Sequence, residues 1–404
     1  MARGLSLVER IYYTDPSCRA FDAVVTQVVE HHGRPGVVLD RTAFYPTSGG
    51  QPFDTGRLIA DGAEVAVAET VDDDAAIVHV VSAPLAAGTR VRGEVEWPRR
   101  FDHMQQHTGQ HVLSAAFDRL FANRTVGFHM GGDVSSIDLE REAPAAEIER
   151  AADEANQVVW ADRPVSIRFA SADEAARLQL RKDPVRQGTL RLIDVDGFDL
   201  SACGGTHVAT TGAIGIIAVT ASERLRGGSR ITFVCGGRAL RTLRQQRDVI
   251  ARSIRVLSVL PDDLPAAIER GQADLKDQRK LIARLQEGLA VHEAARLVAE
   301  APSANGTRVV VASLDGWDAP ALKAVAAAMT SMGTVVTALF SASSPAFVVV
   351  ARSAGVQADA AATLKRLIER FGGRGGGKPD LAQGGGLTGN VEEMRALASE
   401  LLTA

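Results

Sequence analysis

Two short motifs, far apart in the chain, together offer four side chains that can bind a metal ion. His107 and His111 stand four residues apart, and Cys203 and His207 have the same spacing with two glycines between them. On a helix, residues i and i+4 lie one above the other, so both imidazoles of the first motif can reach one ion. The glycines leave the second segment free to curl around it. Three imidazole nitrogens and one thiolate are donors that zinc accepts, and we predict one zinc ion per chain.

Each motif has a plainer interpretation when it is taken alone. A histidine pair at this spacing is common on helix surfaces, and a cysteine and a histidine in a glycine loop are a weak signal, so only their combination favours a metal site. His103 extends the histidine column, but it follows Asp102, which we expect to cap the helix, and we rank it lower. Cys235 lies in a β-prone apolar run, where we expect a buried core residue.

Helices and strands must bring these motifs together. An apolar stripe predicts a helix that carries the histidine pair, and a second helix follows it. β-prone segments surround the cysteine motif, so this part reads as α+β. The predicted helices are 102–122 and 145–161, and the predicted strands are 165–169, 190–195, 214–221 and 230–235.

The chain before the first motif is rich in short β-prone runs separated by glycine, aspartate and proline, which predicts a small barrel or sandwich. Within it lies a glycine- and proline-rich segment, 42–56, whose plain interpretation is a hairpin connection with glycines at positive φ. The β-prone runs are 23–29, 36–39, 65–68, 77–81 and 91–97.

The character of the chain changes after about residue 242. An apolar residue at every seventh position (Ile268, Leu275, Ile282, Leu289) predicts a long helix over 264–298, one arm of a hairpin or of a dimeric coiled coil, although the companion heptad column is imperfect. Strands at 308–313, 334–340 and 346–351 then alternate with helices at 320–331, 358–371 and 391–402, which predicts a separate α/β domain.

Composition sets the broad class of the protein. The chain has 404 residues, of which 46% are hydrophobic and 23% charged, and this balance is typical of soluble globular proteins. Three scattered cysteines argue against a disulfide framework and favour the cytoplasm. We see no secretory signal and no apolar run that would span a membrane. A net charge of −4 argues against binding nucleic acid through bulk charge, but not against a local basic face.

The motifs resemble those of one family. HTGQH and CGGTH are similar to the editing domain that alanyl-tRNA synthetases share with the free-standing alanyl-tRNA editing proteins, the AlaX family. The segment 42–56 resembles the glycine-rich segment that precedes editing in these proteins, and the stretches 125–131 and 136–138 resemble the lining of the editing pocket. The glycine-rich stretch 372–385 resembles the terminal motif of a DHHA1 domain. The resemblance extends over nearly the whole chain in the same order.

The resemblance implies the long, free-standing form of the editing protein, acting in trans. Too few residues precede Thr42 to hold a class II aminoacylation domain, and no DHH motif precedes the DHHA1-like end. The expected fold is multidomain α+β. Its four domains are an N-terminal β-barrel domain with the glycine-rich segment (1–98), a zinc-dependent editing domain (99–240), a helical or coiled-coil segment (241–301) and a DHHA1-like C-terminal α/β domain (302–404).

The implied reaction is hydrolysis of seryl-tRNA(Ala), with glycyl-tRNA(Ala) as a second candidate substrate, while alanyl-tRNA(Ala) is spared. Zinc can activate a water or orient the substrate, and we favour orientation because four protein ligands usually close a zinc site. Sparing alanine requires a group that bonds the serine hydroxyl. The candidates are Thr125 first, then Thr108, Gln110 and His129, the last at a position where related synthetases have a glutamine.

The implied partner is the acceptor end of tRNA(Ala), and a homodimer through the helical or C-terminal region is a further expectation. Candidate phosphate-binding residues are Arg224, Arg226 and Arg230, and Arg374 and Lys378 near the C-terminus, although either group is also typical of a solvated basic loop. Two alternatives stay open. One is a zinc-stapled RNA-binding module without catalysis, and the other is editing of seryl-tRNA(Thr).

Overall fold

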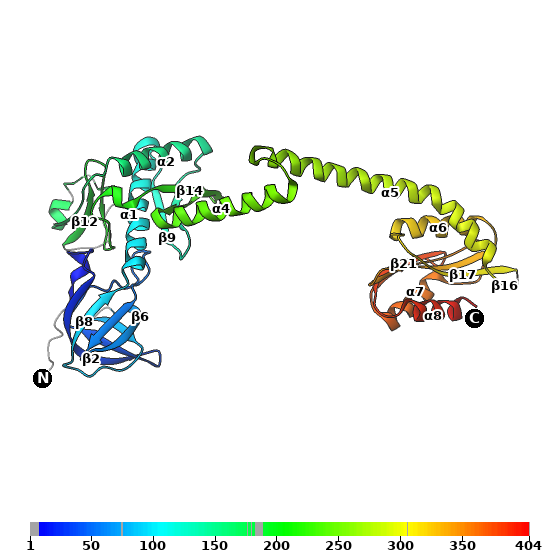
Figure 1. Ribbon diagram of the computed structural model, residues 1–404, viewed down its shortest axis with the longest axis horizontal. Coiled ribbons are helices and arrows are strands. Elements are labelled where there is room, and N and C mark those ends of the chain that lie inside the picture. The colour runs from blue at the N-terminus through cyan, green and yellow to red at the C-terminus, as the bar shows by residue number, and fades with distance from the viewer. Residues whose placement is uncertain are drawn as a thin grey trace. The chain divides into compact units, whose positions relative to one another are not determined.

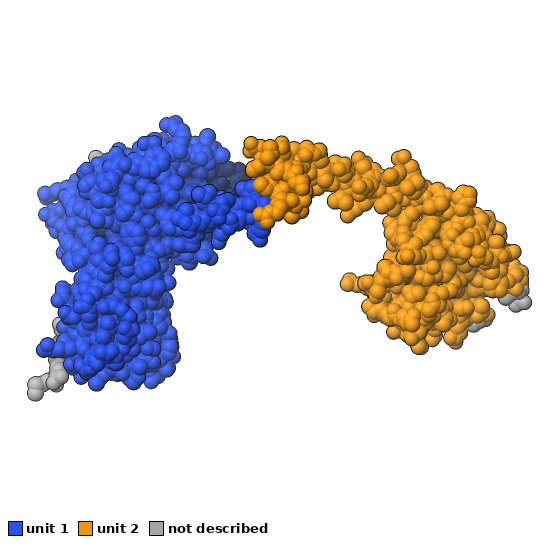
Figure 2. All heavy atoms as spheres, in the orientation of Figure 1, with its two compact units in different colours: residues 1–252 blue, residues 253–404 orange. Residues whose placement is uncertain are grey.

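The computed structural model describes residues 8–73, 76–175, 177–178, 180–181, 189–304 and 306–403. The chain forms two compact units, residues 1–252 and 253–404, which Figure 2 shows in different colours. Among the described residues, no helix is both long enough and apolar enough to cross a membrane.

The first unit begins with a closed six-stranded antiparallel barrel, drawn in blue in Figure 1. Alternate residues of its strands point inward and form one apolar core with the buried Phe44. The strand order around the barrel is β2-β3-β7-β6-β5-β8. The strands are β2 (Ala20–His31), β3 (Arg34–Leu39), β5 (Gly56–Ala60), β6 (Ala63–Asp73), β7 (Ala76–Val81) and β8 (Arg90–Val95), with β1 (Glu9–Arg10), η1 (Ile11–Tyr13) and β4 (Arg41–Thr42) beside them.

The barrel confirms one of the two folds that the β-prone runs predicted, with local differences. Strand β5 was not predicted. The run that was expected to end at Trp97 ends at Val95, because Trp97 and Pro98 start a helix, where proline's missing N–H costs nothing. The prediction of Asp102 as the helix cap was wrong. The N-cap is Glu96, and Asp102 instead accepts hydrogen bonds from Arg238 at 2.7 and 3.0 Å.

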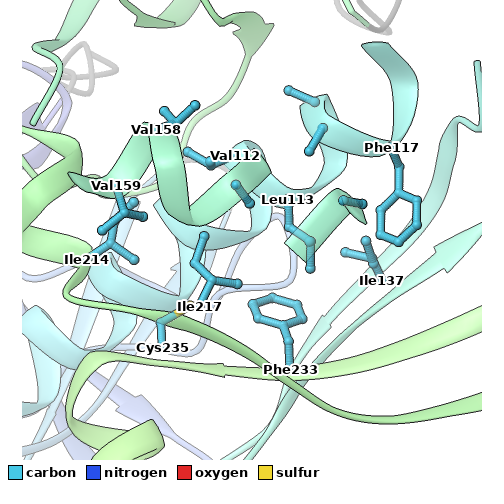
Figure 3. Packing of buried hydrophobic residues seen from close by; sticks show 14 of the residues in the cluster. Val112, Leu113, Phe117, Ile137, Val158, Val159, Ile214, Ile217, Phe233 and Cys235 are labelled. Carbon is cyan, nitrogen blue, oxygen red and sulfur yellow. The ribbon is translucent and has the colours of Figure 1, made fainter. Parts of the chain in front are cut away.

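The rest of the first unit packs two helices against two small sheets. Figure 3 shows Val112, Leu113 and Phe117 of α1 packed among Val158 and Val159 of α2 and residues of the sheet. Cys235 lies in this core, fully buried as predicted. The sheets have the orders β14-β15-β10-β9 and β11-β12-β13. The elements are α1 (Trp97–Phe121), β9 (Thr125–Met130), β10 (Ser135–Leu139), α2 (Ala145–Trp160), β11 (Val165–Ala170), α3 (Ala172–Ala175), β12 (Leu190–Val195), β13 (Asp199–Ala202), η2 (Thr211–Ile214), β14 (Ile217–Leu225), β15 (Gly228–Cys235) and α4 (Gly236–Leu257), whose last five residues belong to the second unit.

The second unit is a six-stranded sheet with helices on both faces. The order is β16-β17-β18-β19-β21-β20, and only the β17–β18 pair is parallel. Helix α6 and the end of α5 cover one face, and α7 and α8 cover the other (Figure 1). The elements are η3 (Pro261–Asp263), α5 (Leu264–Glu300), β16 (Ser303–Ala304), β17 (Thr307–Leu314), α6 (Ala319–Ser331), β18 (Val335–Ser341), β19 (Ala346–Arg352), α7 (Ala360–Phe371), β20 (Arg374–Gly377), β21 (Leu381–Leu387) and α8 (Val391–Thr403).

Candidate metal centre and its pocket

Helix α1 is buried on all sides over most of its length, although it carries many polar side chains. Every residue from His103 to Phe117 is buried. Buried polar groups need hydrogen-bond partners, and these side chains find them in the neighbouring chain. Gln105 donates to the carbonyl of Ala213 at 2.9 Å, and Gln106 both donates to and accepts from the backbone of Cys235, at 3.1 and 2.8 Å. The helix is therefore fixed in rotation, and with it the direction of its two histidines.

The four predicted ligands come together at one point. The potential ligand atoms of His107, His111, Cys203 and His207 all lie within 4.8 Å of one another. The sulfur of Cys203 lies 3.4 Å from Nε2 of His107 and 3.3 Å from Nε2 of His207. The histidine pair comes from the middle of α1, and the other two ligands come from the loop after β13. The structure thus brings together the donor set that the spacing predicted.

The second nitrogen of each histidine is held by a different part of the first unit. Nδ1 of His107 lies 2.9 Å from Oε1 of Gln51 in the glycine-rich segment. Nδ1 of His111 lies 3.0 Å from Asp199, and Nδ1 of His207 lies 3.2 Å from the hydroxyl of Thr108. Metal-binding histidines are usually oriented by such a contact on the far side of the ring. In this arrangement the Nε2 atoms of all three histidines face the space between the four candidate ligands.

The loop between Cys203 and His207 depends on a glycine. A Cβ atom at Gly205 would lie 2.1 Å from Cε1 of His107, so only glycine lets the loop approach the helix. Arg191 holds the same loop, because its Nη1 donates to the carbonyls of Cys203 and Gly205 at 2.7 and 2.9 Å. Its Nε donates to the carbonyl of Tyr13 at 2.9 Å and so ties the loop to η1.

The centre is electrostatically suited to a cation. Burial raises the pKa of the Cys203 thiol, but its contacts with His107 and His207 outweigh burial and hold that pKa well below 9.0, while burial lowers the pKa of His207 to about 3. Burial opposes the charged form of His111, yet its bonds to Asp199 and Cys203 raise its pKa to about 9. The centre therefore stabilises a positive charge between a thiolate and a carboxylate. A divalent ion with imidazole and thiolate ligands meets the same requirement.

A cavity of about 700 Å³ opens onto the centre, and its wall includes His107, His111 and Cys203. Two of the predicted polar candidates, Thr125 and Gln110, also line it. Both bond to the buried hydroxyl of Ser114, to which Thr125 donates at 2.7 Å and Gln110 at 2.8 Å. Because the Thr125 proton points at Ser114, its oxygen is left to accept a hydrogen bond from a group in the cavity.

The other two polar candidates lie elsewhere. Thr108 is fully buried behind His207, where its oxygen also accepts the backbone N–H of Val208 at 3.1 Å, and it is not part of the cavity wall. The side chain of His129 is 65% exposed, lies 3.7 Å from Asp138 and is likewise absent from the wall. Thr108 therefore lies where it can orient the ring of His207, and His129 does not contact the cavity.

The predicted phosphate-binding arginines of the first unit lie on the β14–β15 hairpin. Arg226 is exposed in its two-residue turn. Arg224 pairs with Glu142, and Arg230 pairs with Asp138 at 2.7 Å, so the charges of these two are already partly matched. In the second unit, Arg374 starts β20 and Lys378 follows it in the turn to β21, and both are exposed.

Several residues of the centre were missed by sequence reasoning. Asp199 is buried and accepts hydrogen bonds from His111, from Ser201 at 3.0 Å and from Arg181 at 2.7 Å. Its place four residues before Cys203 was a usable signal, because an acid so close to a ligand often orients another ligand. Gln51 was within reach as well, since it ends the glycine-rich run. No pattern pointed to Arg181 or Arg191.

Three family models match successive parts of the chain. The model described as "tRNA synthetases class II (A)" matches residues 16–99. "Threonyl and Alanyl tRNA synthetase second additional domain" matches residues 190–232, which include Asp199, Cys203 and His207. The "DHHA1 domain" matches residues 306–404.

Curated relatives cover the same order of parts. The chain is 31% identical over 387 residues to "Alanyl-tRNA editing protein AlaX-L" of Pyrococcus horikoshii, and the match covers 94% of both chains. It is 37% identical over 304 residues to "Alanine--tRNA ligase" of Pyrococcus furiosus, and 36% identical over 396 residues to that of Methanoculleus marisnigri. The matches cover only 32% and 42% of those two ligases.

Proposed function

The chain belongs to the family of the alanyl-tRNA editing protein AlaX-L, and on that premise we propose that it hydrolyses the ester bond of seryl-tRNA(Ala) in trans. Glycyl-tRNA(Ala) is the second candidate substrate, and alanyl-tRNA(Ala) is spared. One observation carries the proposal. A single cavity has three of the four candidate metal ligands and the hydroxyl of Thr125 in its wall. An aminoacyl ester is already activated, so an enzyme of this kind chiefly needs to position it and admit a water.

We propose zinc as the ion at the centre. Three imidazole nitrogens and a thiolate fit its preference, and the partners of the three rings fit the pattern of oriented ligands. Bound zinc would supply a fixed positive charge beside the aminoacyl group, and we favour this orienting role over activation of a water. Gln51, Asp199 and Thr108 then act as positioning residues, because each holds one imidazole and none of them lines the cavity.

Selection of serine is assigned to Thr125. Its oxygen can accept the serine hydroxyl, while its own proton is bonded to Ser114. An alanyl group in the same place would leave that oxygen desolvated without a partner, and sites built in this way reject the analogue that lacks the hydroxyl by up to about 10⁴–10⁵. Gln110 keeps Ser114 in place from the other side.

The RNA partner is the acceptor end of tRNA(Ala). In the first unit, Arg226 is the best placed of the predicted phosphate-binding residues, because Arg224 and Arg230 already have acidic partners. In the second unit, Arg374 and Lys378 offer exposed charges on a glycine-rich hairpin. We further propose a cytoplasmic location and a homodimer formed through the helical or C-terminal region.

The test is deacylation of purified seryl-tRNA(Ala), alanyl-tRNA(Ala) and seryl-tRNA(Thr) by the full chain and by Cys203→Ala. We expect the full chain to hydrolyse only seryl-tRNA(Ala). The Cys203→Ala variant should lose both this hydrolysis and the bound zinc. Rapid hydrolysis of the alanyl ester would refute the proposal. A preference for seryl-tRNA(Thr) would favour the threonine system. Zinc-dependent folding with no deacylation would favour an RNA-binding module.

A further inference from the structure

A second cavity, of about 460 Å³, lies in the first unit beside the candidate metal centre. Its wall includes three parts of the chain that also contribute to the first cavity, namely the glycine-rich segment at Pro52, helix α1 at Asp102 and His103, and the chain just after β9 at Gly131 and Gly132. Helix α4 adds Arg238 and Arg241. The editing activity proposed above assigns no role to this cavity.

His103 is an anomaly in this wall. It is 4% exposed, and its Nδ1 is buried without a hydrogen-bond partner among the described residues. Burial lowers its pKa to about 4, so the ring is neutral at physiological pH and offers one donor and one acceptor. An unsatisfied buried polar group destabilises a fold. A phenylalanine at position 103 would fill the same space without an unsatisfied nitrogen, so packing alone does not explain why a histidine is present.

The cavity also has an excess of positive charge. Its wall holds the three arginines Arg99, Arg238 and Arg241 against the two acids Glu96 and Asp102, which leaves one positive charge unmatched. Arg238 is tied to Asp102 and to the carbonyl of Gly131, at 2.7 Å in each case. Arg99 donates its Nε to the carbonyl of Phe53 at 3.0 Å, and Arg241 lies 3.8 Å from Asp102 with a side chain that is 61% exposed. Arg99 and Arg241 are therefore the two residues whose positive charges can bind an anion in this cavity.

The two cavities adjoin along α1 and β9. His103 and His107 are one helical turn apart, a rise of about 6 Å. The ring of Phe128, which lines the first cavity, stacks on His107 at a centroid distance of 5.4 Å. A Cβ at Gly50 would lie 3.0 Å from Phe128, so the glycine-rich segment packs closely against this ring. An RNA strand whose terminal nucleotide lies at the metal centre can place the preceding nucleotide in the second cavity.

We propose that this cavity binds a phosphodiester-linked nucleotide of the acceptor strand, next to the nucleotide that carries the aminoacyl ester. The inference rests on the proposed deacylase function. A phosphodiester carries one negative charge, which matches the excess charge that Arg99 and Arg241 provide. Nδ1 of His103 is buried, and a rotation of the ring would be required for it to reach the O–H and N–H groups of the ribose and the base edge. The cavity would thus bind the RNA chain rather than the amino acid.

The first test uses Arg241→Gln, with Arg244→Gln as the matched control. Arg244 is exposed one turn further along α4 and is not part of the cavity wall. For seryl-tRNA(Ala), we expect Arg241→Gln to raise KM about five- to tenfold with kcat unchanged. The slope of log KM against log salt should fall by about 0.7. Hydrolysis of 2′(3′)-O-seryladenosine, which has no phosphodiester, should stay at the rate of the unaltered chain. Equal effects of the two substitutions, or an equal loss on the adenosine ester, would overturn the proposal.

The second test uses His103→Phe, which removes both ring nitrogens and keeps an aromatic ring. We expect a raised KM for seryl-tRNA(Ala), with an unfolding temperature that is unchanged or higher. A lower unfolding temperature with unchanged KM would mean that the ring is structural and would count against the proposal. If the unaltered chain hydrolyses no seryl ester, the proposed function fails. Anisotropy with uncharged tRNA(Ala) and the same variants then decides on the nucleotide site independently.

Discussion

Oε1 of Gln51 lies 2.9 Å from Nδ1 of His107, so the glycine-rich segment that leaves the barrel directly contacts a candidate zinc ligand. The same oxygen accepts the backbone N–H of Thr206 at 3.0 Å, and the amide nitrogen donates to the Thr206 hydroxyl at 2.8 Å. Gln51 is fully buried and is the point at which the two ligand-bearing motifs and the barrel meet.

Gln51→Leu should therefore weaken zinc binding without removing a ligand. The leucine fills a similar space, but it leaves the ring of His107 and the backbone of Thr206 without their partner. Loss of such an orienting contact typically lowers metal affinity by about 10–100-fold. Competition with a chromogenic chelator measures this change. Gln27→Leu, at an exposed position on β2, is the matched control and should keep the affinity of the unaltered chain. Equal affinities in both variants would exclude a positioning role for Gln51.

Thr125 and Thr108 should respond differently to the same substitution. Thr125→Val removes the acceptor from the cavity, and we expect kcat/KM for seryl-tRNA(Ala) to fall by roughly 10–100-fold while the chain keeps its zinc. Thr108→Val removes the partner of His207 and of the Val208 N–H, so it should lower zinc content and the unfolding temperature. Zinc analysis and deacylation assays on both variants separate the two roles. Loss of zinc in Thr125→Val would contradict the assignment of serine selection to that residue.

The spacing of His107, His111, Cys203 and His207 was sufficient to predict the cluster, because i, i+4 geometry and a glycine loop leave few other arrangements for four donors. The residues that position the cluster were harder to predict. Gln51 and Asp199 lie close to recognised motifs, but their contacts with His107 and His111 join elements that are distant in the chain, and no local pattern pointed to Arg191. Arg191 shows this best, because it lies in β12 and bonds to the carbonyl of Tyr13 in η1 and to that of Cys203 in the loop after β13.

The glycine-rich C-terminal motif shows a second limit of sequence reasoning. The stretch 372–385 was recognised as a motif, yet its strands β20 and β21 were not predicted, because glycine is disfavoured in strands. The backbone explains the composition. A Cβ at Gly375 would lie 2.5 Å from the carbonyl oxygen of Gln383, and one at Gly377 would lie 2.3 Å from Cα of Ala382. Close approach between the two strands, rather than local preference, decides the structure here.

His79 should make the barrel sensitive to acid. It is fully buried, its Nδ1 lies 3.2 Å from the carbonyl of Val37 and its Nε2 lies 2.8 Å from the hydroxyl of Thr42. Burial lowers its pKa to about 4, whereas a histidine in an unfolded chain titrates near 6.5. The stability that comes from the neutral ring is thus fully present above pH 6.5 and is lost as the pH falls towards 4, by about 3 kcal/mol.

Urea unfolding of the full chain and of His79→Gln, at pH 7.5 and 4.5, tests this prediction. The glutamine does not titrate, so the unaltered chain should lose about 2.5 kcal/mol more than the variant between the two pH values. Loss of zinc in acid affects both chains alike and cancels in the difference. An equal loss of stability in both chains would show that His79 does not control the acid response.

The apolar positions of α5 support the proposed homodimer. Ile268, Leu275, Ile282 and Leu289 recur every seventh residue and are 46%, 56%, 53% and 56% exposed. Such a repeat is typical of the seam of a coiled coil, and burying the exposed half of two of these side chains would contribute about 1.5–3 kcal/mol per chain. Leu275→Glu combined with Ile282→Glu should therefore convert a dimer into a monomer in sedimentation experiments. Ala273→Glu with Ala283→Glu, which adds the same two negative charges at exposed positions of α5 outside the apolar column, is the control for added charge and should remain dimeric. Deacylation per chain should be unchanged in both, because the cavity is lined by residues of the first unit alone. A monomeric unaltered chain would refute this assembly.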